Sequence, residues 1–197
     1  MSLLKSERQS LVASHRRIHL RTEDLQRLDD GGWLNDQIVN LYFKLIEKEC
    51  PNVSALDVFF YTNIATGKTV DAFLKQDIFT RDKVLIPVEE AHHWSLIVLD
   101  MENRCINTLD SGFSANRCGN VIRTFLETSE DCPSDWGIRK VKYLPKQKNG
   151  SDCGVFMCQY AVCQAYDIDI KFSQEDIPAF RKAMMLECIT GSLLQRN

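Results

Sequence analysis

The stretch Gln-Lys-Asn-Gly-Ser-Asp-Cys-Gly, residues 147–154, is the part of the chain around which the rest is organised, and the apolar run Val155–Ala165 follows it directly. Its Asn-Gly pair favours a tight turn, and the apolar residues that follow recur at helical spacing. Asp152 or Ser151 can cap a helix that starts at Cys153. The sequence therefore predicts a turn that leads into a helix with a cysteine in its first turn.

Cys153 is a candidate nucleophile at this position. Unpaired backbone N–H groups and the helix dipole at a helix start favour the thiolate over the thiol. The alternative is a small apolar residue that begins a buried helix, which is the more common role of a lone cysteine. The residues upstream decide between the two interpretations.

The composition indicates an ordinary globular chain. Its 197 residues favour one domain, and we expect a flexible segment over residues 1–18 and a single folded domain over residues 19–197. A net charge of −3 gives no basic footprint for nucleic acid and no polybasic membrane patch. The apolar runs are too short to span a bilayer, and no signal-peptide segment begins the chain, so we expect an intracellular protein.

The eight cysteines do not resemble a metal or redox site, because none of them forms a Cys-x-x-Cys pair. No cysteine pair lies near His15 and His19 in the sequence, so we expect no metal. In the absence of a secretory signal we expect reduced thiols, most of them small core residues.

The order of the expected elements indicates an α+β fold, because helices come first, a block of strands follows, and helices close the chain. Before the strands we expect a short helix capped by Thr22, a helix from Asn35 to about Cys50 and a helix over residues 69–76. The apolar segment 58–61 fits either a helix or a strand. After the first strands we expect a helix over 114–128, a strand over 138–144 and a last helix over 174–194 behind Ser173.

The strand block contains a predicted hairpin. Trp94–Leu99 is a continuous apolar run, as in a central strand that is buried on both faces. Arg104–Leu109 alternates and follows a turn at Glu102-Asn103, so it should pair with that strand. A further strand, Lys83–Val88, precedes them.

A thiolate nucleophile needs an imidazole partner and a group that orients the imidazole. Of the four histidines, only His92 and His93 lie near a strand end, and adjacent strand residues face opposite ways, so one of them can face the site. If His93 opens its strand and Asp110 closes the antiparallel neighbour, the two side chains meet at one end of the hairpin. A loop histidine and a turn aspartate are the plainer interpretation of each residue alone.

Catalysis also needs donors for a developing oxyanion. The backbone N–H of Cys153 is one candidate, and the side-chain amide of Gln147, six residues earlier, is a second. A solvated loop residue is the alternative for Gln147.

Four motifs together resemble the SUMO-specific (sentrin-specific, ubiquitin-like-protein) cysteine proteases. They are Trp33-Leu-Asn-Asp36, His93-Trp94, Asp110-Ser111 and Gln147-x-Asn-Gly-Ser-Asp-Cys153-Gly, with gaps of 17 residues from His93 to Asp110 and 43 from Asp110 to Cys153. The similarity covers residues 18–194 and includes Phe59-Phe-Tyr-Thr62 and Pro178-Ala-Phe-Arg-Lys182. No catalytic position departs from the family pattern.

The resemblance implies a papain-like α+β protease fold, with the nucleophile at the N-terminus of a central helix packed on a mixed sheet flanked by helices. It also implies catalytic roles: Cys153 is the nucleophile, His93 the acid/base, Asp110 the orienting carboxylate and Gln147 an oxyanion donor. Trp94 and Trp33 would enclose a narrow tunnel for the Gly-Gly tail of the modifier, Asp36 would contact a basic residue on it, and Phe59 would be a further contact.

The implied reaction is hydrolysis of the bond after the C-terminal glycine of SUMO, in a conjugate or a precursor, by a monomer that uses no cofactor or metal and acts in the nucleus, at its periphery or in the cytoplasm. Three alternatives remain open. They are the same chemistry on a modifier of the Nedd or ubiquitin type, an inactive module that binds the modifier, and an acyltransferase with a papain-like site.

Overall fold

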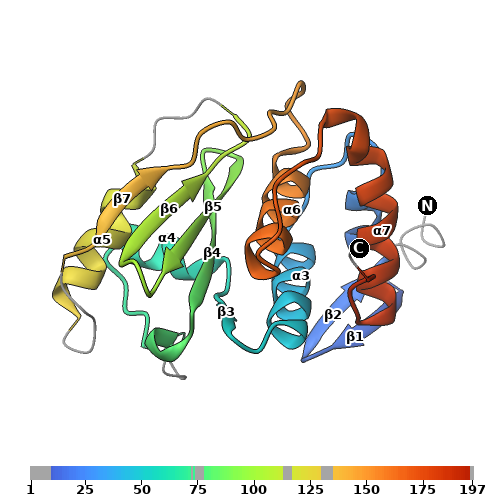
Figure 1. Ribbon diagram of the computed structural model, residues 1–197. Coiled ribbons are helices and arrows are strands. Elements are labelled where there is room, and N and C mark those ends of the chain that lie inside the picture. The colour runs from blue at the N-terminus through green and yellow to red at the C-terminus, as the bar shows by residue number, and fades with distance from the viewer. Residues whose placement is uncertain (1–9, 72, 74–77, 113–116, 130–134, 196–197) are drawn as a thin grey trace.

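The computed structural model describes residues 10–71, 73, 78–112, 117–129 and 135–195 (Figure 1). Its helices are α2 (Thr22–Leu25), α3 (Asp36–Glu49), α4 (Phe59–Ala65), α5 (Cys118–Thr128), α6 (Cys153–Ala165) and α7 (Ile177–Thr190). Short 3₁₀ helices are η1 (Gln26–Leu28), η2 (Ile78–Thr80) and η3 (Gln174–Asp176). None of the helices in this described part has the length and apolar character needed to cross a bilayer.

One sheet of five strands forms the centre of the fold, in the order β3-β4-β5-β6-β7. The strands are β3 (Val53–Ala55), β4 (Lys83–Glu90), β5 (His93–Asp100), β6 (Cys105–Leu109) and β7 (Gly137–Lys140). The outer pairs β3–β4 and β6–β7 are parallel, whereas β4–β5 and β5–β6 are antiparallel. The sheet is therefore mixed, and the predicted hairpin of β5 and β6 is confirmed.

Helices cover both faces of this sheet (Figure 1). On one face, Leu96 and Val98 of β5 pack in a core with α3, α6 and α7. On the other face, Ile97 and Leu99 pack in a second core with α4 and α5. The continuous apolar run of β5 is thus explained, because alternate side chains enter different cores.

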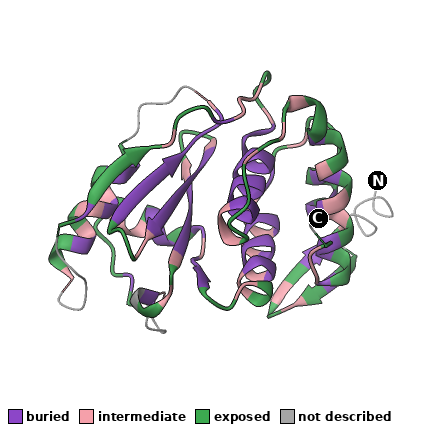
Figure 2. Ribbon diagram, in the orientation of Figure 1, coloured by how far each residue is buried: buried purple, intermediate pink, exposed green. Residues whose placement is uncertain are grey.

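Helix α6 lies between the sheet and α7, and every residue from Cys153 to Cys163 is buried (Figures 1 and 2). A helix that is apolar on all sides belongs inside a core. The α+β class and the central helix that begins at the cysteine are confirmed.

The N-terminal part contains a hairpin where a flexible segment over residues 1–18 was expected. Residues 1–9 lie outside the described part, but β1 (Leu11–His15) and β2 (Ile18–Arg21) form an antiparallel hairpin. The predicted boundary at residue 18 therefore falls inside a hairpin. Thr22, the expected cap, is the first residue of α2, and the backbone N–H of the preceding residue donates to Asp24 Oδ2 (2.8 Å).

Other helix ends follow their local signals. The Asn35 side chain accepts the N–H of Ile38 (3.2 Å), so it caps α3 as expected. Ser173 and Asp176 form a capping box before α7, which ends at Thr190, four residues earlier than predicted.

Three expectations for single segments need correction or lie outside the description. The described residues of 69–76 are not helical, and the remainder of that segment is not described. Within 114–128 the helix begins at Cys118, after residues that are not described. The strand expected over 138–144 stops at Lys140, which pairs with Thr108, because its partner β6 ends at Leu109.

Candidate active site

The hairpin of β5 and β6 brings His93 and Asp110 together. His93 is the first residue of β5, and β6 ends at Leu109 opposite Leu96, so Asp110 leaves the sheet at the same end. The His93 Nε2 atom is 2.7 Å from Asp110 Oδ1. The carboxylate is buried, and the same oxygen accepts the backbone N–H of Gly112 at 2.7 Å. Asp110 therefore fixes both the histidine ring and the loop that follows the strand.

His93 also interacts with the Cys153 side chain, so the ring lies between a carboxylate and a thiol. The hydrogen bond to Asp110, and after it the interaction with Cys153, raise the pKa of His93 to about 10 against the opposing effect of burial. Since Nε2 is engaged by Asp110, Nδ1 is the nitrogen left for the thiol. The arrangement can hold a thiolate–imidazolium pair.

Gly112 leaves room for this ring. A Cβ atom at position 112 would lie 3.0 Å from His93 Cε1 and 3.2 Å from Nε2. Any side chain there would press on the imidazole, which explains on steric grounds why a glycine follows Asp110-Ser111.

Cys153 is the first residue of α6 and is buried. The expected side-chain cap is absent, because neither Asp152 nor Ser151 accepts a backbone N–H of the first turn. The Asp152 carboxylate is turned elsewhere and accepts hydrogen bonds from Arg181 (2.6 Å), Asn149 (2.7 Å) and Gln174 (2.7 Å). Burial alone would raise the pKa of Asp152, but these donors outweigh it and hold the pKa below its usual value.

Arg181 joins this carboxylate to the segment that precedes Trp33. Its side chain is 2% exposed and donates to the carbonyl oxygens of Arg27 (3.1 Å), Asp29 (3.0 Å) and Gly32 (2.8 Å). The role of Arg181 was not predicted, although it lies in the Pro178-Ala-Phe-Arg-Lys motif. The motif thus contributes a buried cation that connects α7 to the residue before α6 and to the segment before Trp33.

Gln147 lies beside the Asp110 loop. Its Oε1 accepts the hydroxyl of Ser111 (2.6 Å), its Nε2 donates to the carbonyl of Asn149 (2.6 Å), and its backbone N–H donates to the carbonyl of Ser111 (3.2 Å). Lys146 Nζ donates to the carbonyls of Asp110 (2.6 Å) and Gly112 (3.0 Å). Sequence reasoning gave Ser111, Lys146 and Asn149 no role in the site, although each lies within two residues of a candidate residue.

The two tryptophans lie in different environments. Trp33 is 49% exposed, and its ring centroid is 6.3 Å from that of His92. Trp94 is only 8% exposed, and its Nε1–H donates to the carbonyl of Leu34 (3.1 Å). A Cβ on Gly154 would lie 2.9 Å from Leu34 Cβ, so the start of α6 packs closely on the Trp33-Leu34 segment. This segment therefore contacts both β5 and the cysteine helix.

His92 is separated from His93 by a turn and not by strand alternation. Glu90 pairs with His93, so Ala91 and His92 form the two-residue turn between β4 and β5. Both have positive φ, 53° and 62°, as in a type I′ turn. The prediction that one histidine faces the site agrees with the geometry, but the reason given for it was wrong.

The remaining predicted contact residues begin helices. Asp36 is the first residue of α3, where the helix dipole stabilises a carboxylate in any case. Phe59 is the first residue of α4 and is 50% exposed. Phe59 is therefore open to a partner and Asp36 is half-buried, whereas Asp110 and Cys153 are buried.

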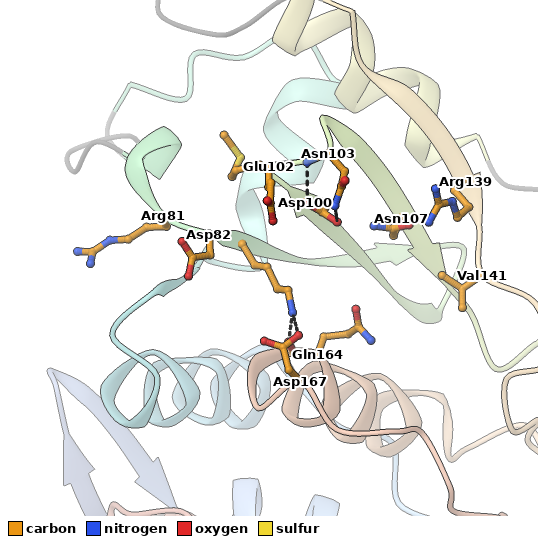
Figure 3. A pocket seen from close by; sticks show the side chains of 12 residues that line it. Arg81, Asp82, Asp100, Glu102, Asn103, Asn107, Arg139, Val141, Gln164 and Asp167 are labelled. Carbon is orange, nitrogen blue, oxygen red and sulfur yellow. Dashed lines mark hydrogen bonds and ion pairs between the residues drawn. The ribbon is translucent and has the colours of Figure 1, made fainter.

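A polar pocket of about 1010 Å³ lies at the opposite end of β5, beside the Asp100–Cys105 turn (Figure 3). Lys83 pairs with Asp167 there, and Asp100 accepts hydrogen bonds from Asn103. None of the candidate catalytic residues lines this pocket. Its size therefore gives no reason to place the chemistry there.

A comparison with protein families matches residues 32–193 to the Ulp1 protease family, C-terminal catalytic domain. Sentrin-specific protease 2 of Rattus norvegicus is 30% identical over 202 residues, which cover 93% of this chain and 34% of the relative. Sentrin-specific protease 5 of Homo sapiens is 37% identical over 179 residues, which cover 85% of this chain and 24% of the relative. The chain thus spans about a third or less of the length of these relatives.

Solved structures agree with the family match. The SUMO protease Ulp1 with its catalytic cysteine oxidised to a sulfenic acid superposes with a TM-score of 0.83 at 25% identity, over 96% of this chain and 91% of the other. The C-terminal Ulp1 protease domain in complex with Smt3, the yeast orthologue of SUMO, has the same fold, with a TM-score of 0.84 at 24% identity and the same coverage.

Proposed function

Since the chain belongs to the Ulp1 protease family, we propose that it is a cysteine protease that hydrolyses the bond after the C-terminal Gly-Gly of SUMO. Such a bond is an isopeptide to a lysine in a conjugate or a peptide bond in a precursor. The observation that carries the proposal is the placement of His93 between the Asp110 carboxylate and a cysteine at the start of the central helix.

In the proposed reaction the Cys153 thiolate attacks the carbonyl carbon of the last glycine. Negative charge develops on the carbonyl oxygen, where the Cys153 N–H and the Gln147 amide act as donors. The imidazolium of His93 protonates the leaving amine, which leaves a thioester. His93 then removes a proton from water, and the hydroxide attacks the thioester. SUMO leaves as a carboxylic acid that loses its proton to solvent, and the Cys153 thiolate and the His93 imidazolium are restored.

The choice of SUMO as the modifier is supported by the relatives, which are named sentrin-specific proteases, and by the Ulp1 domain solved with Smt3. Trp33 and Trp94 would enclose the Gly-Gly tail, since a channel between indole rings admits residues without side chains and excludes water from the thioester. Asp36 and Phe59 would contact the folded part of the modifier.

We place residues 19–197, together with the β1–β2 hairpin that crosses this boundary, in a single catalytic domain that acts as a monomer, without a cofactor or metal, inside the cell. The nucleus or its periphery is the compartment that the family favours, and the cytoplasm is the alternative. The domain boundary, the monomer and the compartment rest on the family and on the composition.

A panel of modifiers tests the proposal. SUMO, ubiquitin and a Nedd-type modifier, each with a fluorogenic group on its C-terminal glycine, are incubated with the wild type and with Cys153→Ser. We expect SUMO to be cleaved at least about 100-fold faster than the others, which corresponds to about 2.7 kcal/mol. If ubiquitin or the Nedd-type modifier were cleaved faster, that modifier would be the substrate in place of SUMO. Binding of SUMO without cleavage would favour the inactive module.

The acyltransferase alternative needs a separate measurement. Mass spectrometry of the protein after incubation with an acyl-CoA would detect a covalent acyl-enzyme if that chemistry were present. We expect no mass increase.

A further inference from the structure

We propose that Ser111 is a positioning residue, which holds the Gln147 amide in the orientation that serves the oxyanion. The proposal rests on the proposed function, because it requires Gln147 to donate to the developing charge. Ser111 has no role in the reaction itself and acts only through Gln147.

Ser111 is placed for this task by the loop that follows β6. It is 1% exposed, and its hydroxyl donates to Gln147 Oε1 at 2.6 Å. The backbone N–H of Gln147 donates to the Ser111 carbonyl, and Lys146 Nζ donates to the carbonyls of the residues on both sides of Ser111. These hydrogen bonds join the segments 110–112 and 146–147 into one unit.

The amide has a defined orientation in this unit. A carbonyl can only accept, so the contact with the Asn149 carbonyl must come from Gln147 Nε2, and Oε1 must face the Ser111 hydroxyl. Nε2 carries two hydrogens. One is engaged by the Asn149 carbonyl, and the other can donate to an oxyanion.

Loss of the Ser111 hydroxyl would release one end of the amide. The terminal torsion of glutamine has a broad energy profile, so the side chain would rotate more freely. The donor would then have to be ordered during the reaction, which lowers the advantage of a preorganised site. The same loop carries Asp110, so the wild type holds the oxyanion donor in fixed relation to the carboxylate that orients His93.

The expected loss is smaller than removal of the donor. Removal of an oxyanion donor typically lowers kcat about 100- to 1000-fold, so we expect Ser111→Ala to lower kcat by about 10- to 50-fold. KM should stay within about two-fold, because the interaction serves the transition state and not the bound modifier.

A double-mutant cycle tests the proposal on the full chain with fluorogenic SUMO. The variants are Ser111→Ala, Gln147→Ala and the double variant, with Ser54→Ala as the matched control. Ser54 is a serine on β3 that is 2% exposed. We expect Ser111→Ala to cause no further loss in the Gln147→Ala background and Ser54→Ala to keep wild-type activity.

Alkylation of Cys153 by iodoacetamide supplies a second measurement, because this reaction develops no oxyanion. Its rate and pH profile should be unchanged in Ser111→Ala, whereas a general disturbance of the site would change both. If Ser111→Ala does not fold, Ser111→Cys, which keeps the shape with a weaker donor, takes its place and should lose several-fold in kcat.

Four results would overturn the proposal. They are wild-type kcat in both Ser111 variants, losses that multiply in the double variant, wild-type kcat in Gln147→Ala, and an altered alkylation profile. In each case the protease activity of the wild type would stand. An inactive wild type would overturn the proposed function and this proposal together.

Discussion

The Asp110 carboxylate accepts two hydrogen bonds on one oxygen, one from the His93 ring and one from the backbone of Gly112. The first raises the pKa of His93, and the second fixes the loop that carries Ser111. The orientation of the base and the orientation of the oxyanion donor therefore depend on a single buried side chain.

The pH dependence of the reaction should report this contact. The pKa of His93 is raised to about 10, so the ring keeps its proton over the neutral range and loses it as the pH rises through about 10. Asp110→Asn removes the largest contribution to this raised pKa. The fall in kcat/KM at alkaline pH should therefore begin at a lower pH. The measurement is kcat/KM for fluorogenic SUMO from pH 6 to 11. A fall that begins at the wild-type pH would show that Asp110 does not set it.

The two adjacent histidines should differ in their effect on the rate. His93→Ala removes the acid/base and should lower kcat/KM by about 100- to 10,000-fold. His92→Ala removes a turn residue that contacts Trp33 and should lower it a few-fold at most. The measurement is kcat/KM for hydrolysis of fluorogenic SUMO by both variants. A larger loss in His92→Ala than in His93→Ala would identify His92 as the base.

Local spacing was enough to predict which side chains meet at the end of the hairpin, because register and turn length fix that geometry. It could not predict the partners of Asp152 and Gln147. Asp152 precedes a helix and looks like a cap, but its partner Arg181 lies 29 residues later, and Ser111 and Gln147 lie 36 residues apart. Contacts of this kind depend on how the elements pack.

At the scale of elements, the buried pair of Arg181 and Asp152 connects α7 to the start of α6 and to the loop before Trp33. A buried cation that also serves three backbone carbonyls is difficult to replace. Its removal takes the counter-ion from the buried carboxylate and one donor from each of those carbonyls.

Arg181→Met should therefore destabilise the fold by about 3–5 kcal/mol. Asp152→Asn combined with Arg181→Met should be less destabilising than the sum of the single changes, because no unpaired buried charge remains. Chemical denaturation measures both, with the exposed neighbour Lys182→Met as the control. Additive losses would mean that the pair is not coupled.

The element order and the hairpin followed from the sequence, whereas the turn between β4 and β5 did not. Ala91 and His92 adopt positive φ without a glycine or asparagine, so no turn signal marked them. The N-terminal hairpin was missed for a related reason, since positive φ at Arg16 and Arg17 reverses the chain without a glycine.

At the scale of the molecule, the proposed tunnel lies where the sheet meets the helical half. Trp94 comes from β5, Trp33 from the segment before α3, and Cys153 from the start of α6. The family resemblance supplied the tunnel, because no periodicity in the sequence indicates which exposed indole faces a substrate.

Trp94→Ala separates a tunnel role from a core role. Trp94 is buried and bonded to Leu34, so the variant should lose about 3–5 kcal/mol of stability in either case. If the indole encloses the tail, the rate with a modifier that ends in Ala-Gly should rise relative to Gly-Gly. The measurement is the ratio of the Ala-Gly rate to the Gly-Gly rate, taken with the folded variant at low temperature. An unchanged ratio would leave Trp94 a core residue only.

The central claim is that Cys153 is the nucleophile, and covalent capture tests it most directly. SUMO with a C-terminal vinyl sulfone is incubated with the wild type, Cys153→Ser and Cys50→Ser, a control at a more exposed cysteine. Intact-protein mass spectrometry should find one SUMO adduct on the wild type and on Cys50→Ser. Cys153→Ser should give none, although it still binds SUMO. An adduct on Cys153→Ser, or its loss in Cys50→Ser, would contradict the account.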